Sequence, residues 1–201
     1  MFYKPSNGHG LPQNPYNAII SPRPIGWIST QDNKGQKNLA PYSFFNATAY
    51  VPPQVMFCST SSKEDQNNTK DSVANIRATG VFCINIVGFE MRKEMNASSI
   101  FLPKDEDEFT FAGLTAEQCK VIDCPRVAGT PAALECELND IITLRGESNY
   151  MVLGEVIGIH LKDECINNGR FDVTTYQPIG RLGYRDYVKV SNLFELQRPN
   201  D

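Results

Sequence analysis

The sequence predicts a mainly β protein with a β-barrel core. Many short runs either alternate apolar and polar residues or are rich in Val, Ile and Phe, and only two or three helical segments interrupt them. This order differs from the alternating strand and helix pattern of a parallel sheet. The 201 residues suffice for a full core, so we expect one domain over residues 1–201.

The first half contains an arm, a hairpin and two further strands. Residues 1–18 are rich in turn-forming residues with little periodicity, and we expect an extended arm. Residues 25–30 alternate, and the turn around Gly35 should fold them into a hairpin with the segment that follows. Residues 54–60 are a short β-prone run, and residues 79–88 are the clearest predicted strand because they are rich in Val, Ile and Phe.

The remaining elements follow the same periods. A helix is expected within residues 69–80, with Thr69 or Asp71 as its cap and Gly80 at its end. Residues 89–101 predict a second helix, and residues 103–109 predict a solvated acidic loop. Two long strands are expected over residues 132–144 and 151–161, followed by a C-terminal extension over residues 185–201.

Composition excludes several functional classes. The net charge of −4 argues against a general nucleic-acid surface or an anionic-membrane surface. No apolar run approaches the roughly 20 residues that cross a bilayer, and the first residues lack the apolar region of a signal peptide. We expect a cytoplasmic protein. The six cysteines are scattered without metal-ligand spacing, so we expect reduced thiols and no metal site.

One long segment carries no charge at all. Residues 38–62 contain no Asp, Glu, Lys or Arg, and they are rich in hydroxyl, amide and aromatic side chains. Three prolines, Pro41, Pro52 and Pro53, exclude a membrane helix. The segment therefore predicts a wall against which a flat, neutral, hydrogen-bonding group can lie.

An anion site is indicated beside this wall. The hydroxyls of residues 59–62 precede Lys70 and Ser72 at a predicted helix start, where free N–H groups attract anions. A hydroxyl-rich loop that only caps a helix is the alternative. Arg23, between Pro22 and Pro24, is presented on a stiff backbone, which suits an anion clamp or a surface salt bridge.

His160 is a weak catalytic candidate. In an extended strand it shares a face with Gly154 and Gly158, where missing side chains leave room for another backbone or a ligand. A packed or hydrogen-bonded histidine is the alternative. Trp27, the only tryptophan, is expected in the core or at an interface.

Four sequence blocks occur in a characteristic order: SPRPIGWIST, NLAPYSFFNATAYVPPQVMF, TKDSVANIRATGVFCINIV and PIGRLGYRDYVKV. Together they resemble the flavin reductase-like, FMN-binding split-barrel family, specifically its flavoredoxin-like branch, over residues 16–198. The resemblance implies a six-stranded antiparallel Greek-key split β-barrel with short helical insertions. It also implies a homodimer with flavin near the subunit interface. Gly183 is followed here by Tyr184, whereas the family commonly has a second glycine.

The resemblance also implies cofactor-binding residues. The PYSFFN segment corresponds to the flavin-lining segment, and STS and KDS correspond to the phosphate and ribityl contacts. With Arg23, the implied FMN-binding set is Ala40, Pro41, Ser43, Phe44, Phe45, Asn46, Ser59, Thr60, Ser61, Lys70, Asp71 and Ser72.

Three functions are compatible with these features. The first is an FMN-dependent oxidoreductase that takes electrons from NAD(P)H and passes them to flavin or to a redox partner. The second is a flavoredoxin-type electron carrier reduced by a redox protein, and the third is a non-enzymatic FMN-binding protein. No proton-transferring residue is required, since hydride chemistry belongs to the cofactor.

Overall fold

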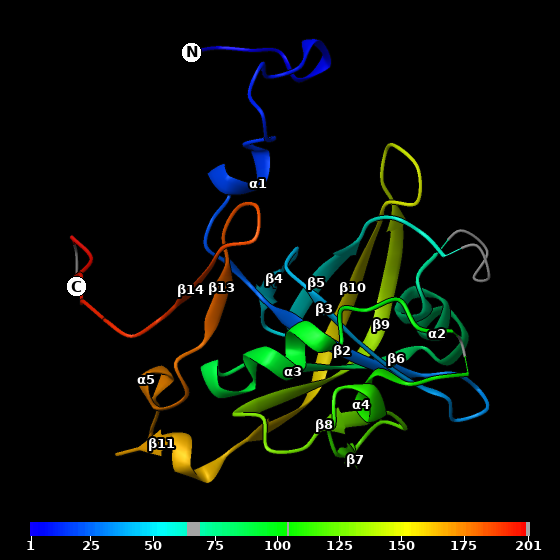
Figure 1. The fold of residues 1–201 in the computed structure, drawn as a ribbon. Coiled ribbons are helices and arrows are strands. Elements are labelled where there is room, and N and C mark those ends of the chain that lie inside the picture. Colours follow the sequence, from blue (N-terminus) through cyan, green and yellow to red (C-terminus); the bar gives the residue numbers. More distant parts are fainter. Residues whose placement is uncertain (64–68, 104, 200–201) are drawn as a thin grey trace.

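A computed structural model describes residues 1–63, 69–103 and 105–199 (Figure 1). Its centre is a seven-stranded sheet in the order β3-β2-β6-β9-β10-β5-β4, in which every neighbouring pair is antiparallel. The strands are β2 (Gly26–Gln31), β3 (Lys37–Tyr42), β4 (Phe45–Tyr50), β5 (Pro53–Ser59), β6 (Val81–Ile86), β9 (Ala132–Thr143) and β10 (Tyr150–Leu161). The mainly β prediction is confirmed.

The sheet curls so that its two ends approach each other. Tyr42 at the end of β3 packs on Phe57 of β5, with ring centroids 4.8 Å apart, and Phe57 packs on Phe82 of β6. These rings fill the barrel core together with branched side chains from β2, β5, β6 and β10. This is the split barrel that we predicted.

The strand count differs from the expectation of six. The sheet has seven strands, and one of them, β4, lies within the uncharged segment and pairs along β5. It forms one edge of the sheet, and Asn46 through Tyr50 are all exposed.

Strand β2 is buried on both of its faces. Ile28 belongs to the barrel core, whereas Trp27 belongs to a second core and donates from its indole N–H to Ser98 Oγ at 2.8 Å. The predicted core position of Trp27 is therefore confirmed. The second core is covered by η3 (Phe89–Met91), α3 (Arg92–Ala97), α4 (Glu108–Phe111) and the hairpin of β7 (Ala116–Gln118) with β8 (Pro125–Val127).

The predicted helix at residues 69–80 is α2 (Asp71–Thr79). It buries Val73 and Ile76 in the barrel core and ends at Gly80, whose φ of 74° is left-handed. Lys70 occupies the N-cap position without a side-chain capping hydrogen bond, so the prediction of Thr69 or Asp71 as the cap is wrong. Asp71 is the first helical residue, and its carboxylate pairs with Lys63.

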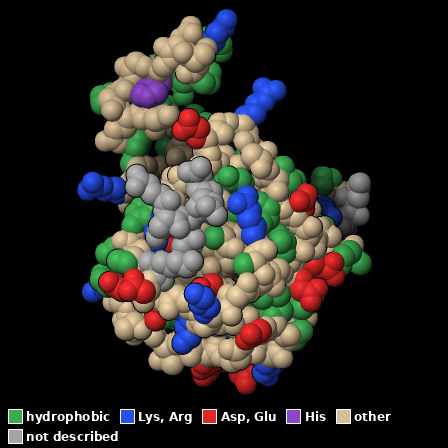
Figure 2. All heavy atoms as spheres, turned by 90° about the vertical axis from the view of Figure 1, so that its right-hand side faces the viewer, with side chains coloured by type: hydrophobic (Ala, Val, Ile, Leu, Met, Phe, Trp, Pro, Cys, Tyr) green, Lys and Arg blue, Asp and Glu red, His purple; other side chains and the backbone are tan. Residues whose placement is uncertain are grey.

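The two ends of the chain flank a small three-stranded sheet in the order β1-β13-β14. The N-terminal arm, which contains two short helical turns, projects from the barrel (Figure 1 and Figure 2). Residues 187–189 of the predicted C-terminal extension form a strand instead, and those after them are mostly exposed. The remaining elements are η1 (Pro5–Asn7), α1 (Tyr16–Ile19), β1 (Arg23–Pro24), η4 (Asp163–Cys165), β11 (Ile166–Asn167), β12 (Arg170–Phe171), α5 (Val173–Tyr176), β13 (Ile179–Arg181) and β14 (Tyr187–Lys189).

The thiols agree with the prediction from composition. All six cysteines are free, and five of them are buried. Within the described ranges, no helix is long and apolar enough to span a membrane.

Candidate functional site

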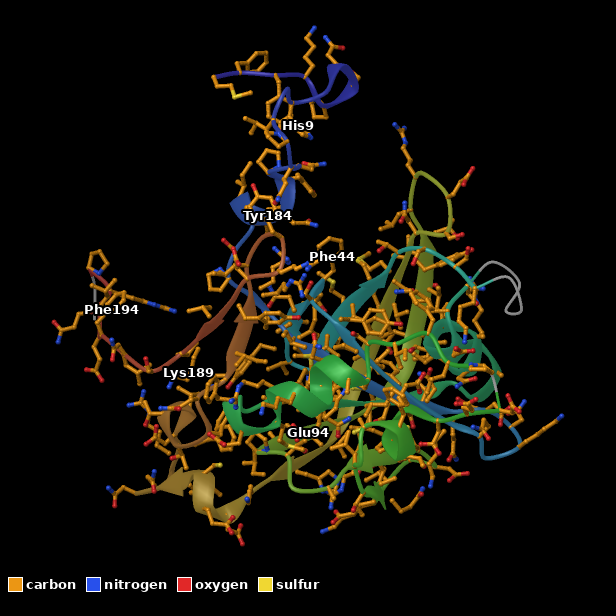
Figure 3. All side chains as sticks on the ribbon, in the orientation of Figure 1. His9, Phe44, Glu94, Tyr184, Lys189 and Phe194 are labelled. Carbon is orange, nitrogen blue, oxygen red and sulfur yellow. The ribbon has the colours of Figure 1, made fainter. Side chains whose placement is uncertain are left out.

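Two adjoining clefts lie where β3 ends and α2 begins. The wall cleft, of about 240 Å³, is lined by Ser43, Phe44, Thr60 and Tyr184 among others. The helix cleft, of about 150 Å³, is lined by the start of α2 and by residues 98–101. Pro41, Tyr42 and Lys70 line both clefts, so they form one continuous candidate site. Figure 3 shows Phe44 and Tyr184 together on the same side of the barrel.

The pairing of β3 with β2 fixes the uncharged wall. Pro41 lies opposite Trp27, and Tyr42 lies opposite Gly26. A Cβ atom on Gly26 would lie 2.9 Å from Phe45 Cγ, so the bare glycine lets the Phe45 ring pack over β2. Phe45 thus contacts the barrel core, while Phe44 lines the wall cleft.

Lys70 is the cation at the junction of the clefts. It immediately precedes the first turn of α2, and its Nζ lies 5.6 Å from the ring centroid of Tyr42 and 5.7 Å from that of Phe101. Burial lowers the pKa of Lys70. Asp71 does not neutralise it, because Lys63 Nζ lies 2.6 Å from the Asp71 carboxylate and also donates to Leu102 O. Among the described residues, Lys70 has no ion-pair partner.

Hydroxyl groups surround this junction at different depths. Ser72 Oγ is buried and accepts a hydrogen bond of 2.9 Å from Asn38 Nδ2. Burial raises the pKa of Tyr42 to about 12, and its hydroxyl faces those of Ser72 and Ser59. Thr60, in contrast, is exposed at the wall cleft, where its hydroxyl is accessible to a ligand.

Arg23 is held by backbone carbonyls. It is only 7% exposed, and its guanidinium donates to Asn17 O, to Ile20 O at 2.5 Å and to Leu182 O at 2.8 Å. The surface salt bridge, one of the two alternatives for Arg23, is not found, since Arg23 has no ion pair among the described residues. Burial, aided by the neighbouring charge of Arg181, lowers the pKa of Arg23. Arg23 still lines the wall cleft, and it ties the loop after β13 to the start of β1.

His160 lies outside both clefts. The space expected beside Gly154 is filled by the Phe82 ring, and the space beside Gly158 is filled by the Glu135 side chain. His160 Nε2 lies 2.5 Å from Glu135 Oε1. The hydrogen-bonded alternative, stated for this residue from the sequence, is therefore what the structure shows.

Glu135 anchors the loop that connects β7 to β8. Its buried carboxylate accepts hydrogen bonds from the N–H groups of Lys120, Val121 and Ile122 at 2.7, 2.7 and 3.0 Å. Burial alone would raise the pKa of Glu135, but these donors and His160 lower it to about 2. No group of three or more acidic, His or Cys residues in the described part of the chain could hold a metal ion.

The clefts gather most of the implied cofactor-binding residues. The wall cleft contains Arg23, Pro41, Ser43, Phe44, Thr60 and Lys70. The helix cleft contains Ala40, Pro41, Lys70, Asp71 and Ser72. Four implied residues line neither cleft: Phe45, Asn46, Ser59 and Ser61.

Phe101 and Arg181 line the clefts but were not predicted from the sequence, and Tyr42, within the PYSFFN segment, and Tyr184, after Gly183, were given no individual role. The prediction of a solvated acidic loop was also wrong for Glu108, which is 6% exposed and accepts a 2.9 Å hydrogen bond from Leu39 N. Burial raises the pKa of Glu108. The available signal was Asp107, which caps α4 by accepting from Thr110 N.

A family model described as a flavin reductase like domain matches residues 20–179. The chain belongs to this flavin reductase like family. An uncharacterised Aquifex aeolicus protein is 36% identical over 173 residues, which cover 86% of each chain.

Two solved structures share the fold of this chain. Nitrilotriacetate monooxygenase component B from Bacillus cereus has a TM-score of 0.87 and 28% identity, covering 98% of each chain. The flavoredoxin of Desulfovibrio vulgaris has a TM-score of 0.75 and 21% identity, covering 87% of this chain and 90% of its own. The family and these structures agree with the resemblance described from the sequence blocks.

We predict that Glu135→Gln lowers the free energy of unfolding at pH 7 by about 1–3 kcal/mol, because three N–H donors lose a charged acceptor. The folded pKa of Glu135 is depressed, so its stabilisation is present above the unfolded value of roughly 4.3 and is lost as the pH falls towards 2. Urea denaturation at pH 7 and pH 3 measures both effects. The difference between wild type and Glu135→Gln should shrink at pH 3.

Glu137→Gln is the matched control, because Glu137 lies on the same strand and is exposed. This variant should unfold like wild type. If Glu135→Gln lowers the free energy of unfolding by the same amount at pH 7 and at pH 3, the ionised state assigned to Glu135 would be contradicted.

Proposed function

We propose that the protein is an FMN-dependent oxidoreductase that takes electrons from NAD(P)H and passes them to free flavin or to a redox partner. The observation that carries this proposal is Lys70 at the start of α2, which has no ion-pair partner among the described residues and lies directly beside the uncharged wall of Pro41 and Phe44. Family membership supports flavin chemistry, and the site supports a flavin that carries a phosphate.

The donor groups suit the FMN phosphate. This group carries nearly two negative charges, and Lys70 together with the free N–H groups of the first turn of α2 provides a positive site. The hydroxyl of Thr60 can add a hydrogen bond from the wall cleft. Because Asp71 is already paired with Lys63, its carboxylate does not cancel the charge of Lys70.

The uncharged wall suits the flavin ring. Pro41 and Phe44 offer apolar surface, while the Ser43 hydroxyl offers a hydrogen-bonding group. Bound FMN supplies a ring that accepts a hydride and releases electrons. The chain positions the ring, shields part of it from water and keeps carboxylates away from its face. His160, bonded to Glu135 outside the clefts, has no essential role in this scheme.

The direct test is the visible spectrum of the purified protein, reconstituted with FMN under anaerobic conditions. Addition of NADH or NADPH should bleach the flavin bands, and free flavin should then sustain turnover. If neither nucleotide bleaches the bands while a reduced redox protein does, the protein is an electron carrier and the proposed reaction is wrong.

Lys70→Ala should weaken FMN binding by roughly tenfold to a hundredfold, the loss expected for a charge-assisted hydrogen bond. Riboflavin has the same ring and ribityl chain without the phosphate, so its affinity should barely change. Both ligands are titrated into wild-type and Lys70→Ala apoprotein, and flavin fluorescence is followed.

The control for this experiment is Lys34→Ala, since Lys34 is an exposed cation in the turn between β2 and β3. Its affinities should match those of wild type. Equal losses of FMN and riboflavin in Lys70→Ala would show that Lys70 supports the ring pocket or the fold, and the phosphate assignment would be wrong.

We also propose that the protein acts as a homodimer. Edge strand β4 carries no charge. Tyr50, its last residue, is 90% exposed, and Val51, which follows it, is 85% exposed. An uncharged, exposed sheet edge is a template for pairing with a second chain. The projecting N-terminal arm leaves Phe2, Tyr16 and Ile19 exposed as well, so it has apolar surface available for a partner.

Sedimentation of the FMN-bound protein should give twice the 22.5 kDa chain mass. Ala47→Lys should shift the protein towards monomer, because it introduces a charge into the β4 edge. Thr143→Lys, at the exposed end of β9, is the control and should remain dimeric. A wild-type monomer with full FMN occupancy would contradict the proposal.

A further inference from the structure

A third cleft lies at the base of the β13–β14 hairpin, on the side away from its tip. This cleft, of about 470 Å³, is lined by Phe89, Arg92, Lys93, Tyr187 and Lys189 among others, and these five residues define what we call the cationic cleft. In Figure 3, Lys189 lies well below Tyr184, which occupies the tip of the same hairpin.

Two of the cations converge on one aromatic ring. The Arg92 guanidinium carbon lies 3.9 Å from the ring centroid of Phe89, and Lys189 Nζ lies 4.6 Å from the same centroid. Arg92 also donates to Phe89 O at 2.8 Å, which fixes its position. Lys93 is exposed at the rim.

The described lining of this cleft contains no carboxylate. Among the described residues, none of the three cations is in an ion pair. The acidic residues nearest in sequence, Glu90 and Glu94, do not line this cleft. Like charges held together destabilise one another, and an anion between them relieves that repulsion. The cleft is therefore suited to an anionic ligand that also has a flat ring for the aromatic and guanidinium surfaces.

The cationic cleft is close to the wall cleft. Arg181 lines the wall cleft, and Tyr187 lines the cationic cleft. The two are directly paired across the hairpin, with the Arg181 guanidinium carbon 4.6 Å from the Tyr187 ring centroid and Arg181 Nη1 donating to the Tyr187 hydroxyl. One member of this stacked pair thus lines each cleft, and a ligand that extends along the pair can reach both.

We propose that the cationic cleft binds the phosphate-bearing adenosine half of the nicotinamide reductant. This inference rests on the proposed function, which places the nicotinamide end against the flavin in the wall cleft. Arg92, Lys93 and Lys189 then face the phosphates, while the aromatic and guanidinium surfaces face the adenine. The Arg181–Tyr187 pair supports the chain between the two ends.

The first test is calorimetric titration of ADP into FMN-saturated protein, in which the phosphate site at Lys70 is already filled. Wild type should bind ADP, and the double variant Arg92→Ala/Lys189→Ala should bind it at least tenfold more weakly, because two charge-assisted contacts are lost. Lys189→Arg should retain binding, and Lys34→Ala should match wild type. Absence of ADP binding to wild type, or equal binding to the double variant, would overturn the proposal.

The second test is steady-state oxidation of NADH and NADPH. In the double variant, KM for the better nucleotide should rise about tenfold or more while kcat and the affinity for FMN stay unchanged, because the lost contacts lie away from the ring. Raised ionic strength should reduce the difference between the variant and wild type, because salt screens these charges.

The outcomes separate the inference from the proposed function. Nicotinamide oxidation with an unchanged KM in the double variant overturns the cationic cleft and leaves the oxidoreductase function intact. Failure of wild type to oxidise either nucleotide overturns the oxidoreductase function and the nicotinamide role of the cleft, even if the cleft binds ADP.

Discussion

The candidate functional site depends on strand β2, which is buried on both of its faces. Strand β2 places Ile28 in the barrel core and Trp27 in the second core, so the sheet must be covered on both faces at this point. Since β3 pairs along β2, residues 40–42 lie at the boundary between the barrel and the helical layer. An uncharged wall results there, because a charge would have to be desolvated between two apolar layers.

Electrostatics then distinguish Lys70 from the two carboxylates near the start of α2. Asp71 is neutralised by Lys63, and Glu108 accepts the N–H of Leu39, so both carboxylates already have partners. Lys70 instead stands over the rings of Tyr42 and Phe101. The positive field at the start of α2 is thus left for a ligand, next to a surface that favours a neutral ring.

Local sequence patterns predicted what depends on local periodicity. The strands rich in Val, Ile and Phe and the helix ending at Gly80 appear where they were expected. Groups whose partners are distant in sequence were missed or misjudged. The acidic run around Glu108 looked solvated because its partner, the N–H of Leu39, is supplied only by the fold. Likewise, the space beside Gly154 and Gly158 is filled by Phe82 and Glu135, which no local pattern reveals.

The central claim is that the chain holds a phosphorylated flavin between the uncharged wall and the start of α2. The most direct measurement is a crystal structure of the protein with FMN bound. The account predicts that the phosphate lies within hydrogen-bonding distance of Lys70 Nζ and the first N–H groups of α2, with the ring against Pro41 and Phe44. A phosphate bound between Arg92 and Lys189, or anywhere else away from Lys70, would contradict it.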